Sequence, residues 1–457
     1  MERKAGTAVK PGETELARQL EYIRAIRAEN DAFAAENGRK KKFYSLAMGC
    51  QMNAHDSEKL EGMLDEMGFD RTDEETEADF IIYNTCCVRE NAEQKVYGKL
   101  GWLKHYKETK NPDAVIALCG CMMQQETVLQ TLRQKYRHVD IVFGTFNLYK
   151  LPELVATRME SGETVYDIWQ EQREVVEDLP AIRHFPYKAS VNIMFGCNNF
   201  CTYCIVPYVR GRERSRTPED ILAEVRRLAA DGVKEVMLLG QNVNSYGKNL
   251  ETPVSFAELL RIVNEVEGIE RIRFMTSHPK DCTHELLDTM AQCEKVAKHL
   301  HLPVQCGNDR VLREMNRGYT AEKYLSLLEY ARSVMPELSV TSDIIVGFPG
   351  ETYEEFLDTV KLIEKAQYTS LYTFIFSPRE GTRAAKMDDP VSREEKGKWF
   401  SELCAAQEKI ASVRTSEMVG REYRVLCESK AKKDGYISGR TQGNIIIEFP
   451  ADESVIG

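Results

Sequence analysis

Short apolar runs alternate with helix-patterned segments along most of this chain, and this alternation restricts the possible folds more than any other feature. Apolar runs occur at 43–48, 80–84 and 114–118, and the segment 54–67 between the first two carries apolar residues at helical spacing. Strand–helix repeats favour a parallel sheet with helices packed against its faces. We therefore expect an α/β fold.

A longer series of strand-like runs follows in the second half of the chain. Helix-like segments separate these runs, and a closing helix is predicted at about 393–416. The runs span 190–195, 235–240, 271–276, 299–305, 338–348 and 371–376. Six parallel strands with intervening helices indicate a partial (β/α)6 barrel. Residues 417–457 contain short strands with turns and predict a small β module that stops early, since a barrel would normally need another strand or two.

These patterns also predict the domain boundaries. We expect a helical extension over 1–40, a parallel-sheet domain over 41–165, a barrel domain over 183–416 and the β module over 417–457. Residues 150–188 are acidic and weakly periodic, so we interpret them as a connector.

Charge and composition exclude some classes of protein. The net charge of −11 argues against a uniformly basic nucleic-acid coat, although local basic patches still allow RNA binding. No apolar run is long enough to span a membrane, and the charged N-terminus lacks a secretory signal, so we expect a cytoplasmic protein without membrane contact. Sustained heptads are absent, which favours a monomer.

The chain contains 13 cysteines, and their grouping suggests chemistry rather than disulfides. Cys50, Cys86 and Cys121 each follow a predicted strand, about one strand–helix unit apart, so all three should lie along the carboxyl edge of one parallel sheet. Three thiolates meeting at that edge would hold a metal centre. The alternative is three unrelated buried thiols. Of the neighbouring cysteines, we expect Cys119 to be a buried structural thiol and Cys87 to point away from the site.

A second set of three cysteines lies in "GCNNFCTYCIVPYVRG" at 196–211, after the first strand of the predicted barrel. Cys197, Cys201 and Cys204 form one Cys-x3-Cys-x2-Cys motif, with Tyr203 before the last cysteine. A structural zinc site uses four ligands, commonly two pairs, and no second pair is present at a useful spacing. Three thiolates instead suit a cubane iron–sulfur cluster whose fourth iron stays open for a ligand.

This motif, at the first strand of an α/β barrel, resembles that of the radical S-adenosylmethionine (SAM) superfamily. In the first half, "GCQMNAHDSE", "YNTCCVRENAEQK" and "CGCMMQQE" are similar to the motifs of its methylthiotransferase family. The resemblance covers about residues 43–457 and includes "LLGQNVNSYG", "TSHP", "LPVQCGNDRVLREMNRGYT", "DIIVGFPGET" and "SPREGTRAA". It implies a methylthiotransferase domain over 41–165, a radical SAM domain over 183–416 and a TRAM-like RNA-binding module over 417–457.

The resemblance also implies the cofactors and the reaction. Cys197, Cys201 and Cys204 would hold a 4Fe–4S cluster that binds SAM and splits it into methionine and a 5′-deoxyadenosyl radical. Cys50, Cys86 and Cys121 would hold a second 4Fe–4S cluster that presents the sulfur, which a second SAM methylates. The substrate carbon is an aromatic C–H that no side-chain base is strong enough to deprotonate, so the cofactors carry the difficult step.

The form of the first motif separates three branches of this family. "GCQMN" favours the branch that adds a methylthio group to carbon 2 of N6-isopentenyladenosine at position 37 of tRNA. Related branches modify a ribosomal-protein side chain or threonylcarbamoyladenosine in tRNA, and these remain alternatives. A protein of another class, an iron–sulfur carrier or scaffold without catalysis, would leave the six barrel strands and the residues at their mouth unexplained.

Several polar residues near predicted strand ends are candidates for SAM contacts. Tyr203 should lie near the SAM adenine, and Gln241 follows the second barrel strand, where the superfamily binds the SAM amino group. Gln305 and Asp343 end later strands and would face the same mouth. The alternative for each is a structural polar side chain, and we also expect a structural role for His278 in "TSHP".

Two basic segments are candidates for tRNA phosphate contacts. The segment "RGRERSR" follows the cluster loop, and "KAKK" lies in the β module. The candidates are Arg210, Arg212, Arg214, Arg216, Lys430, Lys432 and Lys433. The alternative for the arginines is pairing with acids such as Glu213 and Glu219.

Expected partners besides tRNA are a flavodoxin- or ferredoxin-like electron donor and proteins that deliver iron–sulfur clusters and sulfur.

Overall fold

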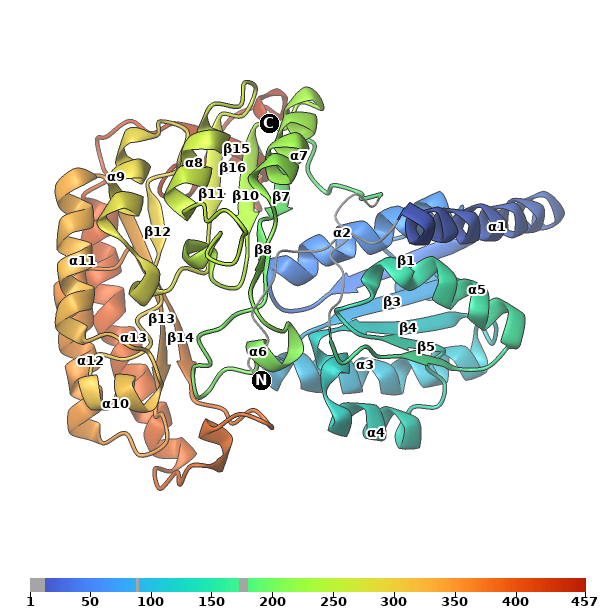
Figure 1. Cartoon of the computed structure of the whole chain (residues 1–457), viewed down its shortest axis with the longest axis horizontal. Helices are drawn as coiled ribbons and strands as arrows, with labels where there is room; N and C mark the ends of the chain where they lie inside the picture. The colour runs from blue at the N-terminus through green and yellow to red at the C-terminus, as the bar shows by residue number, and fades with distance from the viewer. Residues whose placement is uncertain (1–12, 88–89, 172–179) are drawn as a thin grey trace. The chain divides into compact units, whose positions relative to one another are not determined.

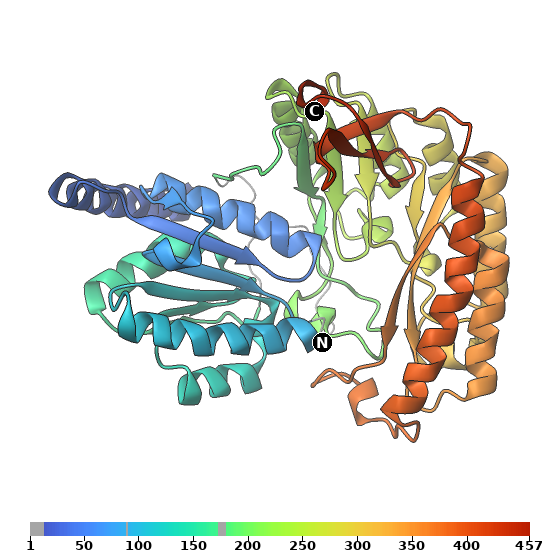
Figure 2. The same cartoon turned by 180° about the vertical axis from the view of Figure 1, so that it is seen from behind.

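A computed structural model of the chain describes residues 13–87, 90–171 and 180–457 (Figures 1 and 2). These residues form two compact units. The N-terminal unit holds the described residues up to His184 together with Ile205–Arg212, and the barrel unit holds Phe185–Cys204 and Glu213–Gly457. The domain boundaries expected from the sequence did not include this return of Ile205–Arg212 to the N-terminal unit.

The N-terminal unit is built on one six-stranded parallel sheet. Its spatial order is β2 (Asp70–Arg71), β1 (Lys42–Ala47), β3 (Phe80–Thr85), β4 (Val115–Gly120), β5 (Ile141–Phe143) and β6 (Val165–Asp167). Helices α1 (Glu13–Asn37), α2 (Gln51–Glu66) and α5 (Leu151–Ser161) pack on one face. Helices α3 (Glu90–Thr109) and α4 (Glu126–Lys135) cover the other face, together with α6 (Val206–Val209). This arrangement confirms the predicted α/β class.

Residues alternate between the two faces along the central strands of this sheet. In β3, Phe80 and Ile82 join the core under α2, whereas Ile81 and Tyr83 join the core under α3. Side chains of successive strand residues point to opposite faces, so a strand buried on both sides is apolar throughout. Figure 1 shows the helices on both sides of the sheet.

Helix α1 is part of the N-terminal core, although the sequence predicted an extension with few core positions. Ile23 and Ile26 are buried in the core under α2, and the Asn30 side chain donates to the backbone oxygen of Met67 at 2.9 Å. The buried positions lie three or four residues apart, one helical face, but the many charged residues between them hide this pattern.

The segment 150–188 was predicted to be a connector, and this prediction was wrong for its first part. Helix α5 and strand β6 lie within it, and β6 pairs in parallel with β5 at the edge of the sheet. Leu151, Leu154 and Val155 are the buried face of α5. A helix of only 11 residues gives a weak periodic signal.

The barrel unit contains the six predicted parallel strands in sequence order. Strands β7 (Lys188–Asn192), β10 (Glu235–Leu239) and β11 (Arg271–Phe274) form one ladder, and β12 (His299–His301), β13 (Ser339–Val346) and β14 (Ser370–Ile375) form another. The barrel helices cover the outside (Figure 2). The partial barrel is therefore confirmed, with a weak junction between β11 and β12.

Threonine and serine set the starts of the barrel helices. Their side-chain oxygens accept from backbone N–H groups of the first turn, which stabilises each start. The helices are α7 (Pro218–Ala230), α8 (Phe256–Asn264), α9 (His284–Gln292), α11 (Ala321–Val334), α12 (Tyr353–Ala366) and α13 (Arg393–Ser416), with α10 (Asp309–Glu314) capped by Asn308. Each lies between strands, so the caps reinforce the strand–helix order.

The last part of the chain is an antiparallel sheet of β15 (Val425–Lys430), β16 (Tyr436–Thr441) and β17 (Ile446–Pro450). The predicted small β module is confirmed as these three strands. Arg273 of β11 donates to the backbone oxygens of Thr441 and Gln442 at 2.6 and 3.0 Å, so the β16–β17 turn is bound at the amino end of the barrel strands.

Within the described residues, no helix is long and apolar enough to cross a membrane.

Candidate metal centres

Cys50, Cys86 and Cys121 lie at one edge of the N-terminal sheet, as the sequence predicts. Cys50 is the residue before α2 and follows β1, Cys86 follows β3, and Cys121 follows β4. These three strands are adjacent and parallel, so their carboxyl ends meet. The nearby Cys87 and Cys119 are buried in the cores on opposite faces of the sheet, which favours a structural role for both.

Glycines before two of these cysteines allow the close approach. Gly49 and Gly120 have φ angles of +103° and +96°. A Cβ on Gly49 would lie 2.5 Å from the sulfur of Cys86, and a Cβ on Gly120 would lie 2.3 Å from the backbone oxygen of Thr85. Glycine is the residue that tolerates both the left-handed conformation and this contact.

Two polar side chains connect the sulfurs of this site. The sulfurs of Cys50 and Cys121 each lie 3.8 Å from Oδ1 of Asn53, in the first turn of α2. Nε of Arg210 donates to the Cys121 sulfur at 3.1 Å, and its Nη2 donates to Asn53 Oδ1 at 2.6 Å and to Asp56 Oδ2 at 2.8 Å. Sequence reasoning did not identify Asn53 or Asp56, although their positions about one and two helical turns after Cys50 were a usable signal.

Burial and charge act in opposite directions on this site. Burial raises the pKa of the Cys121 thiol to about 12, while the Arg210 guanidinium lowers it. Burial lowers the pKa of Arg210, but Cys121 and Asp56 more than offset this and raise it well above its ordinary value. Arg210 therefore supplies a positive charge beside a sulfur that becomes a thiolate when it binds iron.

The three cysteines fit an iron–sulfur cluster in donor type and position. Among the described residues, no three His, Cys, Asp or Glu side chains are grouped for a single metal ion. The ligands of a four-iron cluster bind different iron atoms and so lie farther apart than those of one ion. Three cysteine sulfurs converging from adjacent strands, with a cation beside one of them, match this requirement.

The second cysteine set lies in the barrel unit after β8 (Met194–Phe195), at the carboxyl end of the first barrel strand. Cys197 and Cys201 are buried, and Cys204 is partly exposed. The loop is held by Thr202, whose N–H and hydroxyl donate to the backbone oxygens of Met315 and Glu314 at 3.1 and 2.8 Å. Burial raises the pKa of Cys197 to about 12, so iron must displace the proton here as well.

A buried arginine accompanies this second set too. Arg317 donates to the Cys201 sulfur at 3.3 Å, to the Tyr203 hydroxyl at 3.4 Å and to the backbone oxygen of Pro303 at 2.6 Å. Arg317 is only 4% exposed. Sequence reasoning missed Arg317, because an arginine in a loop 116 residues after its cysteine shows no local signal.

The predicted SAM-contact residues lie around the carboxyl end of the barrel, with one difference. Gln241 accepts a hydrogen bond from the N–H of Gly196, next to Cys197. Gln305 forms an isolated parallel β-bridge with Ile344 of β13. Asp343 was expected at a strand end but lies inside β13, because this strand continues to Val346. Its carboxylate lies 3.5 Å from His301 Nε2.

The predicted RNA-contact residues fall into two groups. Arg210 and Arg216 are buried, and Arg216 pairs with Glu224 at 2.6 Å. We therefore propose no phosphate contact for either residue. Arg214 is partly buried, which lowers its pKa to about 10, whereas Arg212 is exposed. The three lysines of the β module are all exposed: Lys430, Lys432 and Lys433.

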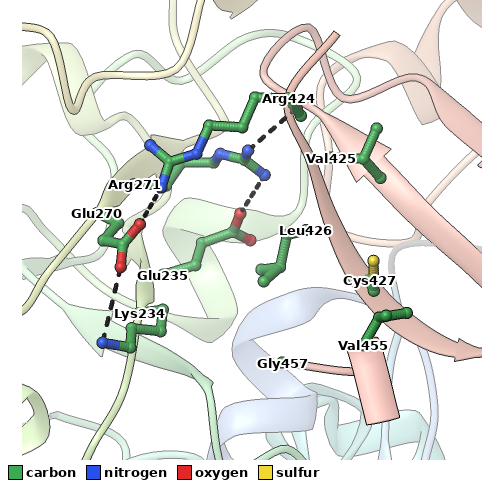
Figure 3. A pocket seen from close by; sticks show the side chains of 10 residues that line it. All are labelled: Lys234, Glu235, Glu270, Arg271, Arg424, Val425, Leu426, Cys427, Val455 and Gly457. Carbon is green, nitrogen blue, oxygen red and sulfur yellow. Dashed lines mark hydrogen bonds and ion pairs between the residues drawn. The ribbon is translucent and has the colours of Figure 1, made fainter. Parts of the chain in front are cut away.

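A pocket in the barrel unit lies at the amino ends of β10 and β11, against β15 of the module (Figure 3). Ion pairs line it, with Arg271 against Glu235 and Lys234 against Glu270. This is the end of the strands opposite to the cysteine loop. We therefore do not assign it to SAM.

The chain is similar to known proteins over nearly all of its length. The radical SAM superfamily matches residues 191–363, and the uncharacterized protein family UPF0004 matches residues 42–144. The tRNA-2-methylthio-N(6)-dimethylallyladenosine synthase of Acetivibrio thermocellus is 52% identical over 97% of this chain and 92% of the relative. The synthase of the same name from Clostridioides difficile is 51% identical over 96% of this chain and 92% of the relative.

This chain belongs to the tRNA-2-methylthio-N(6)-dimethylallyladenosine synthase family. As a member of the radical SAM superfamily, it uses SAM and an iron–sulfur cluster. A solved structure of TsrM, a radical SAM methyltransferase from Kitasatospora setae, aligns with a TM-score of 0.53 at 15% identity. The alignment covers 76% of this chain and 74% of TsrM and supports the fold.

Proposed function

We propose that this chain adds a methylthio group to carbon 2 of N6-isopentenyladenosine, also called N6-dimethylallyladenosine, at position 37 of tRNA. The observation that carries the proposal is the pair of three-cysteine sites, one in each unit. A radical SAM enzyme that only opens a C–H bond needs one such site, and the second set offers a place for the sulfur. The relatives are named as synthases of 2-methylthio-N(6)-dimethylallyladenosine in tRNA, which is the product of this reaction.

Each cysteine set has its own role in this proposal. Cys197, Cys201 and Cys204 hold the cluster that binds SAM, and Cys50, Cys86 and Cys121 hold a second cluster. When bound, these groups supply the radical that opens the C–H bond and the sulfur that is joined to carbon. The protein positions the base and excludes water.

Four side chains of the barrel are proposed to contact SAM: Tyr203, Gln241, Gln305 and Asp343. The placement of Gln241 beside the cysteine loop supports its assignment, because its amide oxygen already accepts from Gly196. The Asp343 carboxylate lies 3.5 Å from His301 Nε2, so two polar side chains meet beside β13. Both arrangements favour a polar ligand over the barrel mouth.

For tRNA, we propose contacts from Arg212, Arg214 and the three lysines of the β module. Exposure of Lys430, Lys432 and Lys433 supports this, because phosphates are bound from the surface. A cytoplasmic location, a monomeric state, a flavodoxin- or ferredoxin-like electron donor and sulfur-delivery partners complete the proposal.

The test uses anaerobically reconstituted enzyme, SAM, a reductant and tRNA that carries isopentenyladenosine. Nucleoside mass spectrometry is expected to detect the methylthio product with wild type. The Cys50→Ala, Cys86→Ala, Cys121→Ala variant should still cleave SAM to 5′-deoxyadenosine but form no product. SAM cleavage by wild type without tRNA product would contradict the proposal. Product with threonylcarbamoyladenosine tRNA or a ribosomal protein would instead identify the related activity.

A further inference from the structure

The segment that follows the radical SAM cysteines contributes to the other cysteine site. Cys204 belongs to the barrel unit, but the next residues, Ile205–Arg212, belong to the N-terminal unit. Ile205 and Val209 are buried in the core under α3, and the Thr145 hydroxyl donates to the Val209 backbone oxygen at 2.8 Å. This packing fixes the backbone immediately before Arg210.

Arg210 directly follows Val209 in this segment and points into the site of Cys50, Cys86 and Cys121. It is only 6% exposed. One edge of its guanidinium donates to the sulfur of Cys121 at 3.1 Å, and another nitrogen donates to Asn53 and Asp56. A planar group with several donors satisfies a sulfur and two oxygens at once, which a lysine ammonium does less well.

The surroundings of Arg210 explain why its charge belongs to a cluster and not to RNA. The side chain is enclosed and its nitrogens donate to protein atoms, so a phosphate would have to displace Asp56 at 2.8 Å. A buried guanidinium needs negative charge beside it, and the Asp56 carboxylate supplies part of that charge. An iron-bound Cys121 would add a thiolate on the other edge of the guanidinium.

We infer that Arg210 is a positioning residue for the cluster held by Cys50, Cys86 and Cys121, and that its hydrogen bond to the Cys121 sulfur raises the reduction potential of that cluster. The inference rests on the proposed function, which places a cluster there. A nearby cation favours the reduced, more negative state, and hydrogen bonds to ligand sulfurs act in the same direction. The Asp56 carboxylate holds the guanidinium in place.

The experiment measures this potential directly in the full chain. Cys197, Cys201 and Cys204 are replaced by alanine, so that the remaining cluster is the only one observed. Its midpoint potential is followed by electron paramagnetic resonance during a redox titration without RNA. Arg210→Gln is expected to shift the potential to more negative values, and Arg210→Lys is expected to recover part of the shift because the charge is kept.

Arg137→Gln is the control, because Arg137 is an exposed arginine of the same unit, between α4 and β5, with no proposed role in binding. It should leave the potential unchanged. An Arg210→Gln protein that keeps its iron and has the wild-type potential would overturn the inference. If the Arg210→Gln protein holds no iron, the iron content of the Arg210→Lys protein is the deciding measurement. Iron bound by the lysine variant supports the role of the charge. Loss of iron together with loss of folded structure in both variants would show a role in folding only.

This experiment also separates the inference from the proposed function. If the parent protein without the barrel cysteines binds no iron, the second cluster is absent and the proposed function loses its sulfur site. If the parent binds iron and the Arg210 variants match it in potential, only the role of Arg210 fails.

Discussion

Gly120 precedes Cys121 with a φ of +96°, and a Cβ there would lie 2.3 Å from the backbone oxygen of Thr85. We predict that Gly120→Ala destabilises the N-terminal unit by about 1–3 kcal/mol, the usual cost of a strained backbone position. It should also reduce the iron bound by the site of Cys50, Cys86 and Cys121, because Cys121 moves. Thermal unfolding and iron analysis of the same samples measure both effects.

Gly101 provides the control for this prediction. It lies inside α3, and a Cβ there would meet nothing within 4 Å. Gly101→Ala should therefore leave the iron content unchanged and raise stability by about 0.5–1 kcal/mol, since alanine favours helix over glycine. Equal behaviour of the two variants would contradict a special role for Gly120.

Glu351 makes the stability of the barrel unit depend on pH. Burial raises its pKa to about 7 from an ordinary value of 4.5, although the N–H groups of Gly347 and Phe348 donate to it. Between these pH values the folded protein binds more protons than the unfolded one, so stability falls as pH rises, by about 3 kcal/mol in total. In Glu351→Gln, the free energy of unfolding should no longer decline between about pH 4.5 and 8. Denaturant unfolding at a series of pH values measures this.

Glu354→Gln is the control, because Glu354 is exposed in the first turn of α12. Its stability should follow the wild-type curve across the same pH range. A Glu351→Gln curve that also runs parallel to wild type would show that Glu351 has no raised pKa in the folded protein.

At the scale of elements, α1 belongs to the N-terminal core. Ile26 is 2% exposed and packs under α2 and the sheet. Ile26→Ala should destabilise the N-terminal unit by about 2–5 kcal/mol, through lost burial and the cavity that remains. Denaturant unfolding measures the change.

Glu29→Ala on the exposed side of α1 should change stability by no more than about 0.5 kcal/mol. An Ile26→Ala protein as stable as this control would mean that α1 adds little to the core, as expected of an extension with few core positions.

Most elements of this fold were predictable because each strand is a compact apolar run between turns. Strands β3, β10 and β14 begin within one residue of their predicted starts. Helix α1 was harder, because its buried residues are few and separated by charges, and α5 was harder because it is only 11 residues long. Asp343 was expected at a strand end, but the predicted run 338–348 already contains it, and β13 places it inside the strand.

At the scale of the whole molecule, Arg273 connects the β module to the barrel within the barrel unit. It donates to Glu235 at 2.9 Å and to the backbone oxygens of Thr441 and Gln442. Hydrogen bonds of charged groups contribute about 1.5–3 kcal/mol each. Arg273→Met should therefore speed hydrogen exchange in β16 and β17 by at least about tenfold.

Arg424→Gln is the comparison for this variant, because Arg424 pairs with Glu270 at the exposed rim of the pocket. It should change exchange in β16 and β17 very little, since exposed ion pairs contribute little. Unchanged exchange in the Arg273→Met protein would mean that other contacts hold the module.

The two cysteine sets were predictable from sequence, but their buried neighbours were not. Strand–helix spacing placed Cys50, Cys86 and Cys121 at one sheet edge, because parallel strands share their carboxyl edge. Arg210 looked like a phosphate ligand because it lies in a run of arginines. Its true neighbours, Asn53 and Asp56, are more than 150 residues away in sequence. Contacts across such separations follow from packing, which local patterns do not encode.

The most direct test of the account is the iron and sulfide content after anaerobic reconstitution. Wild type and the Cys197→Ala, Cys201→Ala, Cys204→Ala variant are compared. Two independent clusters predict about eight irons in wild type and about four in the variant. About four irons falling to none would mean that Cys50, Cys86 and Cys121 hold no cluster, and the proposed methylthio transfer would lose its source of sulfur.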